Sequence, residues 1–233
     1  MTQHFLPIGP NGEPQIEVHL RRSKRARRIS LRVSRLDGRV SLTLPQRVPE
    51  KEGLAFVAQK ADWVRSQLSD LPGEILVDLG ASIPFQGELL DIALGSAKTV
   101  SIESDMLLVP SGRKAVGRQV EAFLKLQARE RLVAASDRYA QALGRPYSKF
   151  TLRDTRSRWG SCTSAGGLMY SWRLIMAPEE VLNYVAAHEV AHLDQMNHSP
   201  KFWALVERLY GPFQAERRWL KQHGEKLHRY RFA

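Results

Sequence analysis

The segment PEEVLNYVAAHEVAHL, which begins at Pro178, constrains the fold of this chain more than any other. A proline at the first helical position, two acids in the first turn and apolar residues at helical spacing predict a helix with one face in the core. His188 and His192 lie on that apolar face, four residues apart, so both imidazoles can reach one ion. Buried imidazoles need partners, and one metal ion would satisfy both.

Glu189 stands between the two histidines and completes the run HEVAH. A carboxylate in this position can take a proton from a water molecule whose pKa a zinc ion has lowered to about 7. The pattern therefore predicts metal-assisted hydrolysis, most often of a peptide bond. The alternative is a solvated polar helix surface, since the motif fixes only three residues, but the apolar context of this helix favours the metal site.

A catalytic zinc ion usually takes three protein ligands and leaves its fourth position to water. His198 is the predicted third ligand, because Asn197 can end the helix and Ser199-Pro200 can begin the next one, so that the chain turns back over the ion. Glu207 and Glu216 are the rival candidates, as carboxylates from a following helix.

The amino-terminal part is predicted to be mainly β. Strands are expected at IEVHLRR, RISLRVSR and RVSLTLP, with a hairpin turn at Asp37-Gly38 between the last two. One helix is expected over residues 50–68, closed by Leu71-Pro72-Gly73, and short strands follow to Pro110. We expect the accessory region to span residues 1–110, with the junction at Ser111-Gly112.

The second part, residues 111–233, is predicted to be an α+β domain. A long helix over residues 114–143 should end at Gly144. Helices are then expected to pack on a small antiparallel sheet. The expected strands are KFTLRDT, RWGSC and LMYSWRLI, and the later helices span residues 199–210 and 214–226.

The motifs RWGSC at 158–162, SWRL at 171–174, HEVAH and MNHSPKFW together resemble the YgjP-like metallopeptidases, which are relatives of the SprT-like zinc proteases. The basic segment RRSKRARRISLRV and the helix FVAQKADWVRSQL resemble the accessory region of the same family. The resemblance implies a zinc metallopeptidase with a zincin-like catalytic domain, one Zn²⁺ per chain and a protein or peptide substrate, while the lack of an apolar span predicts a cytoplasmic location. It also implies that Glu189 is the catalytic acid and base and that the ligands are His188, His192 and His198.

The RWGSC strand is the predicted substrate-binding element. An extended peptide can add itself to an exposed sheet edge, with Gly160 permitting close approach and Arg158 or Trp159 lining the cleft. The alternative is that Trp159, Gly160 and Trp172 simply pack the sheet against the metal helix. Cys162 is predicted to be a small buried hydrophobe. Three side chains could stabilise the oxyanion, and the sequence does not choose among Arg158, Tyr170 and Tyr210.

The chain carries a net charge of +11, and its basic residues are unevenly spread. No acid lies between Glu17 and Asp37, a stretch that could attract nucleic-acid phosphates without sequence preference. No nucleic-acid reading module accompanies it. The alternative function is therefore a basic nucleic-acid-associated protein with a structural or vestigial metal site. The basic residues are Arg21, Arg22, Lys24, Arg25, Arg27, Arg28, Arg32 and Arg35.

No apolar run approaches the roughly 20 residues that a membrane span needs, so no membrane contact is predicted. The single cysteine excludes an internal disulfide, which suits the reducing cytoplasm.

Overall fold

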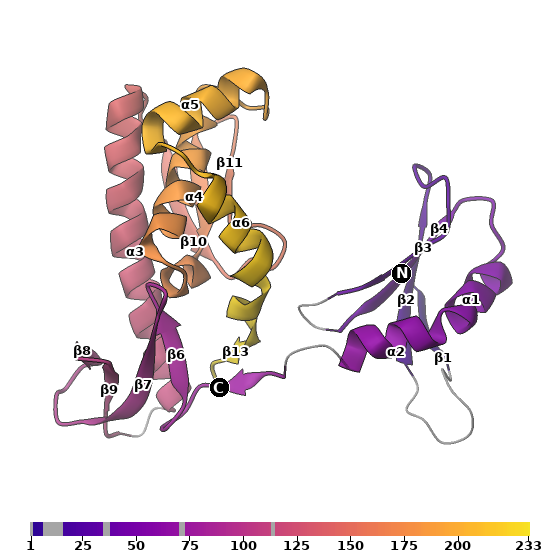
Figure 1. Cartoon of the computed structure of the whole chain (residues 1–233), viewed down its shortest axis with the longest axis horizontal. Coiled ribbons are helices and arrows are strands. Elements are labelled where there is room, and N and C mark those ends of the chain that lie inside the picture. The colour runs from indigo at the N-terminus through magenta and orange to yellow at the C-terminus, as the bar shows by residue number, and fades with distance from the viewer. Residues whose placement is uncertain (1, 7–15, 35–37, 70–72, 113–114) are drawn as a thin grey trace. The chain divides into compact units, whose positions relative to one another are not determined.

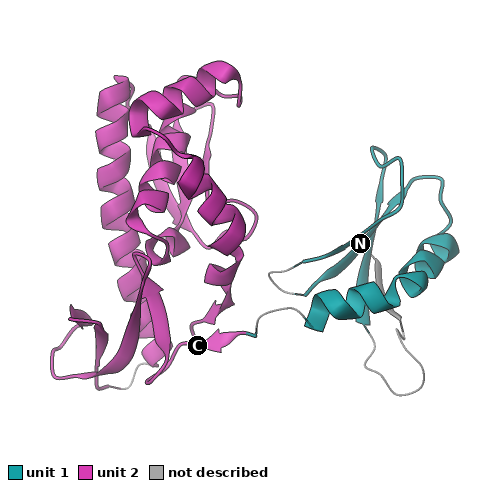
Figure 2. Cartoon of the chain, viewed as in Figure 1, with its two compact units in different colours: residues 1–73 teal, residues 74–233 magenta. Residues whose placement is uncertain are grey.

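The computed structural model describes residues 2–6, 16–34, 38–69, 73–112 and 115–233 (Figure 1). The chain forms two compact units, residues 1–73 and 74–233 (Figure 2). This structural division precedes the expected junction at 110/111, because strand residues such as Ile83, Ile92 and Leu107 share one buried cluster with the later helices. The functional division into an accessory region, 1–110, and a catalytic domain, 111–233, stays a prediction.

Unit 1 is a four-stranded sheet, order β1-β2-β4-β3, in which β2 and β4 run parallel and the other pairs antiparallel. Its strands are β1 (Thr2–Leu6), β2 (Ile16–Ser23), β3 (Ser30–Val33) and β4 (Val40–Pro45). Alternating apolar residues of β2 and β4 share a core with α1 (Glu50–Gln59) and α2 (Ala61–Ser69). One continuous helix was expected over residues 50–68, but it breaks at Lys60, whose backbone (φ −100°, ψ 14°) leaves the helical region.

The expected hairpin between β3 and β4 is antiparallel, with Val33 opposite Val40. Gly38 has a positive φ of 67°, which glycine adopts at little cost. Three predicted turn residues, Asp37, Leu71 and Pro72, lie outside the described residues.

Unit 2 opens with a second small sheet, order β6-β7-β9-β8. The helix α3 (Val116–Leu143) follows and ends, as predicted, at Gly144, which adopts the left-handed conformation (φ 73°). The first strands of the unit are β5 (Ile75–Leu76), β6 (Ser82–Phe85), β7 (Glu88–Gly95), β8 (Ser101–Glu103) and β9 (Met106–Pro110).

The third sheet has the order β10-β12-β11 and is formed by β10 (Lys149–Arg153), β11 (Gly160–Cys162) and β12 (Gly167–Ser171). The prediction of an antiparallel sheet was wrong for one pair: β11 and β12 form an antiparallel hairpin, but β10 runs parallel to β12. The connection over residues 154–159 carries the chain past β12, so that β10 and β11 lie on opposite sides of it.

The predicted strand over 168–175 ends at Ser171, and the 3₁₀ helix η1 (Trp172–Met176) replaces its second half. All five residues of η1 are buried. The alternation of buried and exposed residues that is typical of a strand therefore ends at Ser171. The remaining elements are α4 (Glu179–Ala191), α5 (Pro200–Tyr210), α6 (Gln214–His223), the 3₁₀ helix η2 (Gly224–Arg229) and β13 (Tyr230–Arg231), which pairs parallel with β5. The last predicted helix, 214–226, therefore ends three residues early.

No helix in the described ranges is long and apolar enough to cross a membrane. A cytoplasmic location stays a prediction.

Arg173 joins η1 to the end of the chain. Its side chain is 5% exposed, forms two bonds to the Asp154 carboxylate (2.7 and 3.1 Å), and donates to the carbonyl oxygens of Leu227 (2.8 Å) and Tyr230 (3.2 Å). Burial opposes ionisation of Asp154, but the hydrogen bond and the charge of Arg173 lower the pKa of this carboxyl overall. The interaction therefore secures η2 and β13 against the sheet that precedes the metal helix.

We expect Arg173→Met to lower the free energy of unfolding by about 3 kcal/mol, because it leaves Asp154 and two carbonyl groups without their donor. Urea unfolding measures this change. The matched control is Arg145→Met, since Arg145 pairs with Asp194 at the surface (2.9 Å) and its loss should cost less than about 1 kcal/mol. Equal losses in the two variants would contradict the structural role of Arg173.

We expect the protein to lose stability in mild acid because of His228. Its ring packs on Trp159 (5.2 Å between centroids), and burial, followed by the charge of Arg173, lowers its pKa to about 4. The unfolded chain, with a histidine pKa near 6.5, therefore binds the proton more readily, and stability falls as the pH drops from about 6.5 towards 4. His228→Gln should show a smaller difference in unfolding free energy between pH 7 and pH 5 than the wild type. An unchanged difference would contradict this cause.

Candidate metal centre

Helix α4 is buried on nearly every side from Val181 to His192. It packs against α3, α5, α6 and β11. Val181, Tyr184 and Val185 belong to the core, as the predicted apolar stripe requires. The helix therefore carries two imidazoles and a carboxylate into an otherwise apolar interior.

The structure brings His188, His192 and His198 together. One ligand-type nitrogen from each ring lies within 4.8 Å of the other two. The Nε2 atoms of His188 and His198 are 3.1 Å apart. The rival carboxylates, Glu207 and Glu216, are not members of this cluster in the part of the chain that the structure describes.

These nitrogens suit a zinc ion. Nitrogens that lie about 2.0–2.1 Å from zinc at the corners of a tetrahedron are about 3.3 Å apart, close to the observed 3.1 Å separation. Two imidazole nitrogens at this distance must share a proton or a cation to avoid repulsion. Three imidazoles are a donor set that catalytic zinc sites use when they keep one position open.

The chain fixes His192 by a hydrogen bond. His192 caps the end of α4, and its Nδ1 donates to the carbonyl oxygen of Gln195 (2.8 Å), which leaves Nε2 with a free electron pair for a metal. The chain reaches His198 through residues 193–197, and Ser199 then caps α5 by accepting from the backbone N–H of Phe202. The predicted start of α5 at Ser199-Pro200 is therefore confirmed, whereas the predicted end of the preceding helix at Asn197 was wrong, because α4 ends at Ala191.

Aromatic packing holds the rings in place. Phe202 from α5 stacks on His192 (4.4 Å, 23°) and meets His188 and His198 edge-on (4.9 and 4.8 Å). Trp203 stacks on His198 (5.5 Å, 25°). Burial, followed by the nearby imidazoles, lowers the pKa of His188 to about 3, so its ring is neutral, as metal binding requires.

Glu189 follows His188 on α4, and its carboxylate lies against β11. Its side chain is 6% exposed, and burial raises the pKa of its carboxyl to about 8, while the charge of Arg158 lowers it. Gly160 makes the space: a Cβ atom there would lie 2.5 Å from Cγ and Oε1 of Glu189. The sequence predicted that Gly160 lets a substrate approach the backbone closely. In the structure the side chain that lies close to Gly160 is Glu189.

The other two predicted substrate-binding residues, Arg158 and Trp159, have different environments. Arg158 is exposed, and its charge acts on Glu189. Trp159 packs against His228, and a side chain at Gly224 would meet its ring at 2.9 Å, which supports the alternative of structural packing. Trp172 is 1% exposed and therefore belongs to the core. Cys162 is half-buried, and burial raises the pKa of its thiol to about 11, which opposes a nucleophilic role.

The three oxyanion candidates are not equivalent. Tyr170 is fully buried and accepts from Ser136 (3.1 Å), so a substrate cannot reach it. Tyr210 donates to the carbonyl oxygen of Glu180 (3.0 Å). Arg158 is the most exposed of the three, and its charge acts on Glu189.

Arg217 is a further candidate for stabilising the oxyanion, and the sequence alone did not identify it. Its guanidinium lies 4.8 Å from the centre of the Trp203 ring, the same ring that stacks on His198, and its charge contributes to the low pKa of His188. Arg217 lies near Arg218, Lys221 and Lys226 in the sequence, and this spacing of charges fits an ordinary solvated helix. No local sequence signal therefore identifies it.

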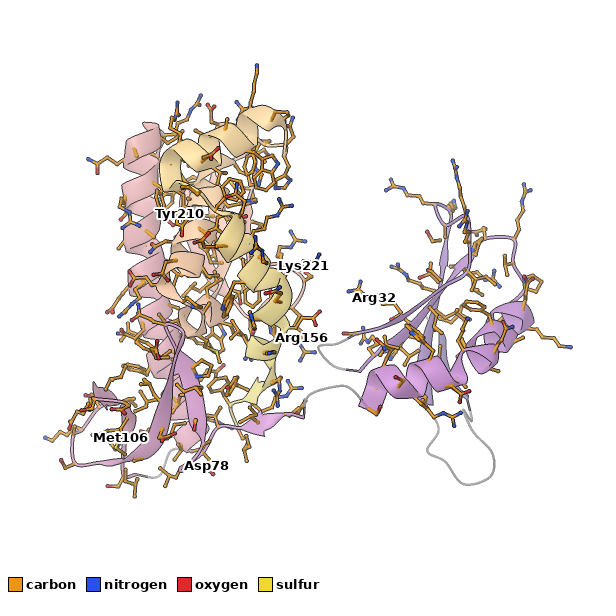
Figure 3. The ribbon with its side chains drawn as sticks, in the orientation of Figure 1. Arg32, Asp78, Met106, Arg156, Tyr210 and Lys221 are labelled. Carbon is orange, nitrogen blue, oxygen red and sulfur yellow. The ribbon has the colours of Figure 1, made fainter. Side chains whose placement is uncertain are left out.

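The predicted basic segment lies in unit 1. Arg21 donates to Thr43 (2.8 Å), and Arg22 donates to the carbonyl oxygens of Gln46 and Val48 (3.1 and 2.8 Å), so these two residues stabilise the end of the sheet. Arg32 is exposed on β3 (Figure 3). The other exposed cations are Lys24, Arg25, Arg27 and Arg28, while Arg35 lies outside the described residues.

Comparison with solved structures finds the metallopeptidase zymogen of Pyrococcus abyssi abylysin, at 20% sequence identity and a TM-score of 0.35, over 39% of this chain and 93% of the other. No curated protein matches the sequence. The sequence profile of the YgjP-like metallopeptidase domain matches residues 27–223, which cover most of both units. The chain therefore belongs to the YgjP-like metallopeptidase family.

Proposed function

We propose that this protein is a zinc-dependent peptidase with a zincin-like catalytic domain, which holds one Zn²⁺ through His188, His192 and His198. The observation that carries the proposal is the convergence of the imidazoles of His188, His192 and His198 around the helix that also carries the buried Glu189. Family membership supports a protein or peptide as the substrate.

When bound, zinc would polarise the scissile carbonyl and lower the pKa of the attacking water. In our proposal Glu189 takes a proton from that water at a carboxylate oxygen and returns it to the leaving amine. Arg217, whose charge acts on His188, is the proposed donor to the negative charge that develops on the carbonyl oxygen.

The alternative, a nucleic-acid-associated protein with a structural metal, keeps one supporting observation in the exposed cations of residues 24–32. A structural zinc site usually has four protein ligands. Within the described ranges the histidine cluster supplies three. Nonspecific nucleic-acid contact through segment 21–35 therefore stays a separate proposal. Salt-sensitive DNA binding by a zinc-loaded protein that cleaves no peptide would favour the alternative function.

Metal content and hydrolysis of casein should separate the roles of the site residues. We expect about one zinc per wild-type chain, loss of zinc in His198→Ala, and retained zinc with at least about 100-fold slower hydrolysis in Glu189→Gln, because only the proton acceptor is removed. Mass spectrometry and an activity assay on the same samples measure both quantities.

Glu207→Gln is the matched control, because Glu207 is an exposed carboxylate of α5 outside the cluster. It should keep both zinc and activity. Loss of zinc in this control, or wild-type zinc affinity in His198→Ala, would move the third ligand away from His198. Undiminished turnover in Glu189→Gln would refute its proposed role.

Gly160→Ala tests the position of the carboxylate. The new methyl group would collide with Glu189 and displace its carboxylate, for which we expect about 100-fold slower hydrolysis with unchanged zinc content. Gly112→Ala is the control, since a Cβ there meets nothing within 4 Å. Full activity of Gly160→Ala would show that hydrolysis tolerates a displaced Glu189.

A further inference from the structure

A basic pocket of about 590 Å³ lies over the sheet β10-β12-β11. On β10, Lys149, Thr151 and Arg153 alternate with Phe150 and Leu152, which pack against the core, so the first three share the outer face. On β11, Gly160 faces Glu189 and the following residue, Ser161, lines the pocket. The pocket is therefore on the face of the sheet opposite α4. We call it the outer-face pocket.

The outer-face pocket has the chemistry of an anion-binding surface. Three cations line it, Lys149, Arg153 and Arg158, and none of its described lining residues is an acid. The nearest acid in sequence, Asp154, is bound to Arg173.

These groups are available to a ligand. None of the three cations forms an ion pair with another residue in the described ranges, and the hydroxyls of Thr151, Ser157 and Ser161 have no hydrogen-bond partner there. Charged and hydroxyl donors that face one space without acceptors are suited to carboxylates, which accept several hydrogen bonds.

The outer-face pocket extends from β10 across β12 to β11, where Ser161 lines it. This strand pairs with β12 on one side only and is an edge of the sheet in the described part of the chain. A peptide that adds to such an edge directs alternate side chains to the two faces of the sheet. Side chains on the outer face would meet the outer-face pocket, while the main chain passes Glu189.

We propose that the outer-face pocket binds acidic side chains of the polypeptide substrate close to the scissile bond, so that the enzyme prefers acidic segments. This inference rests on the proposed peptidase function. An acidic peptide fits better than a nucleic acid, because the pocket adjoins the strand edge beside the catalytic carboxylate and accommodates a few side chains.

The test uses two fluorogenic peptides. The acidic peptide has Asp and Glu on one side of the cleavage site, and the neutral peptide has Asn and Gln at the same positions. At low salt we expect about tenfold higher kcat/KM for the acidic peptide, through a lower KM at similar kcat, since each exposed ion pair contributes little. The double variant Lys149→Gln/Arg153→Gln should cleave both peptides equally. Lys221→Gln on α6, outside the pocket (Figure 3), should keep the preference.

Binding of the same peptides to zinc-loaded Glu189→Gln, followed by fluorescence anisotropy, gives a readout that does not depend on turnover. Tighter binding of the acidic peptide, lost when Lys149→Gln and Arg153→Gln are added to Glu189→Gln, supports the pocket even where the wild type cleaves neither peptide. Absence of cleavage by the wild type would count against the peptidase function alone. Equal cleavage and equal binding of the two peptides by the wild-type pocket would overturn the inference. Single-stranded DNA that binds through Lys149 and Arg153 more tightly than the acidic peptide would overturn it in favour of a nucleic-acid site.

Discussion

The structure depends on burying a helix that carries polar groups on two sides. α4 is surrounded by α3, α5, α6 and β11, so each of its ionisable side chains needs a specific partner. The imidazoles pack against Phe202 and Trp203 of α5, and Glu189 lies against the backbone of Gly160. Packing thereby fixes the positions of the three imidazoles and the carboxylate, and such preorganisation is what the proposed hydrolysis requires.

The sequence predicted the metal helix well because all of its signals are local. Pro178, the acidic first turn and the apolar spacing identify the helix, and its periodicity places His188 and His192 on one face. The helix start at Ser199-Pro200 predicted that His198 lies close to His188 and His192, although α4 ends at Ala191 and not at the predicted Asn197. The α/β composition and the end of α3 at Gly144 follow from similarly local signals.

Nonlocal features could not be predicted in the same way. β13 pairs with β5 across most of the chain, and no local pattern indicates which strand a two-residue segment will join. The parallel pairing of β10 with β12 depends on the path of residues 154–159, which carry no turn signal for it. Arg217 acquires its place beside His188 only when α6 packs on α4, so its role is a property of the tertiary fold.

The short strand β11 explains how one sheet can serve two purposes. Because successive residues of a strand face opposite sides, Gly160 admits the Glu189 carboxylate while Ser161 opens to the cations of the outer-face pocket. A larger residue at 160 would displace the carboxylate, and a shift of one residue in the pairing with β12 would exchange the two faces. The register Gly160 opposite Tyr170, whose side chain is fully buried, prevents that shift. The buried Tyr170 therefore determines which residues of β11 face Glu189.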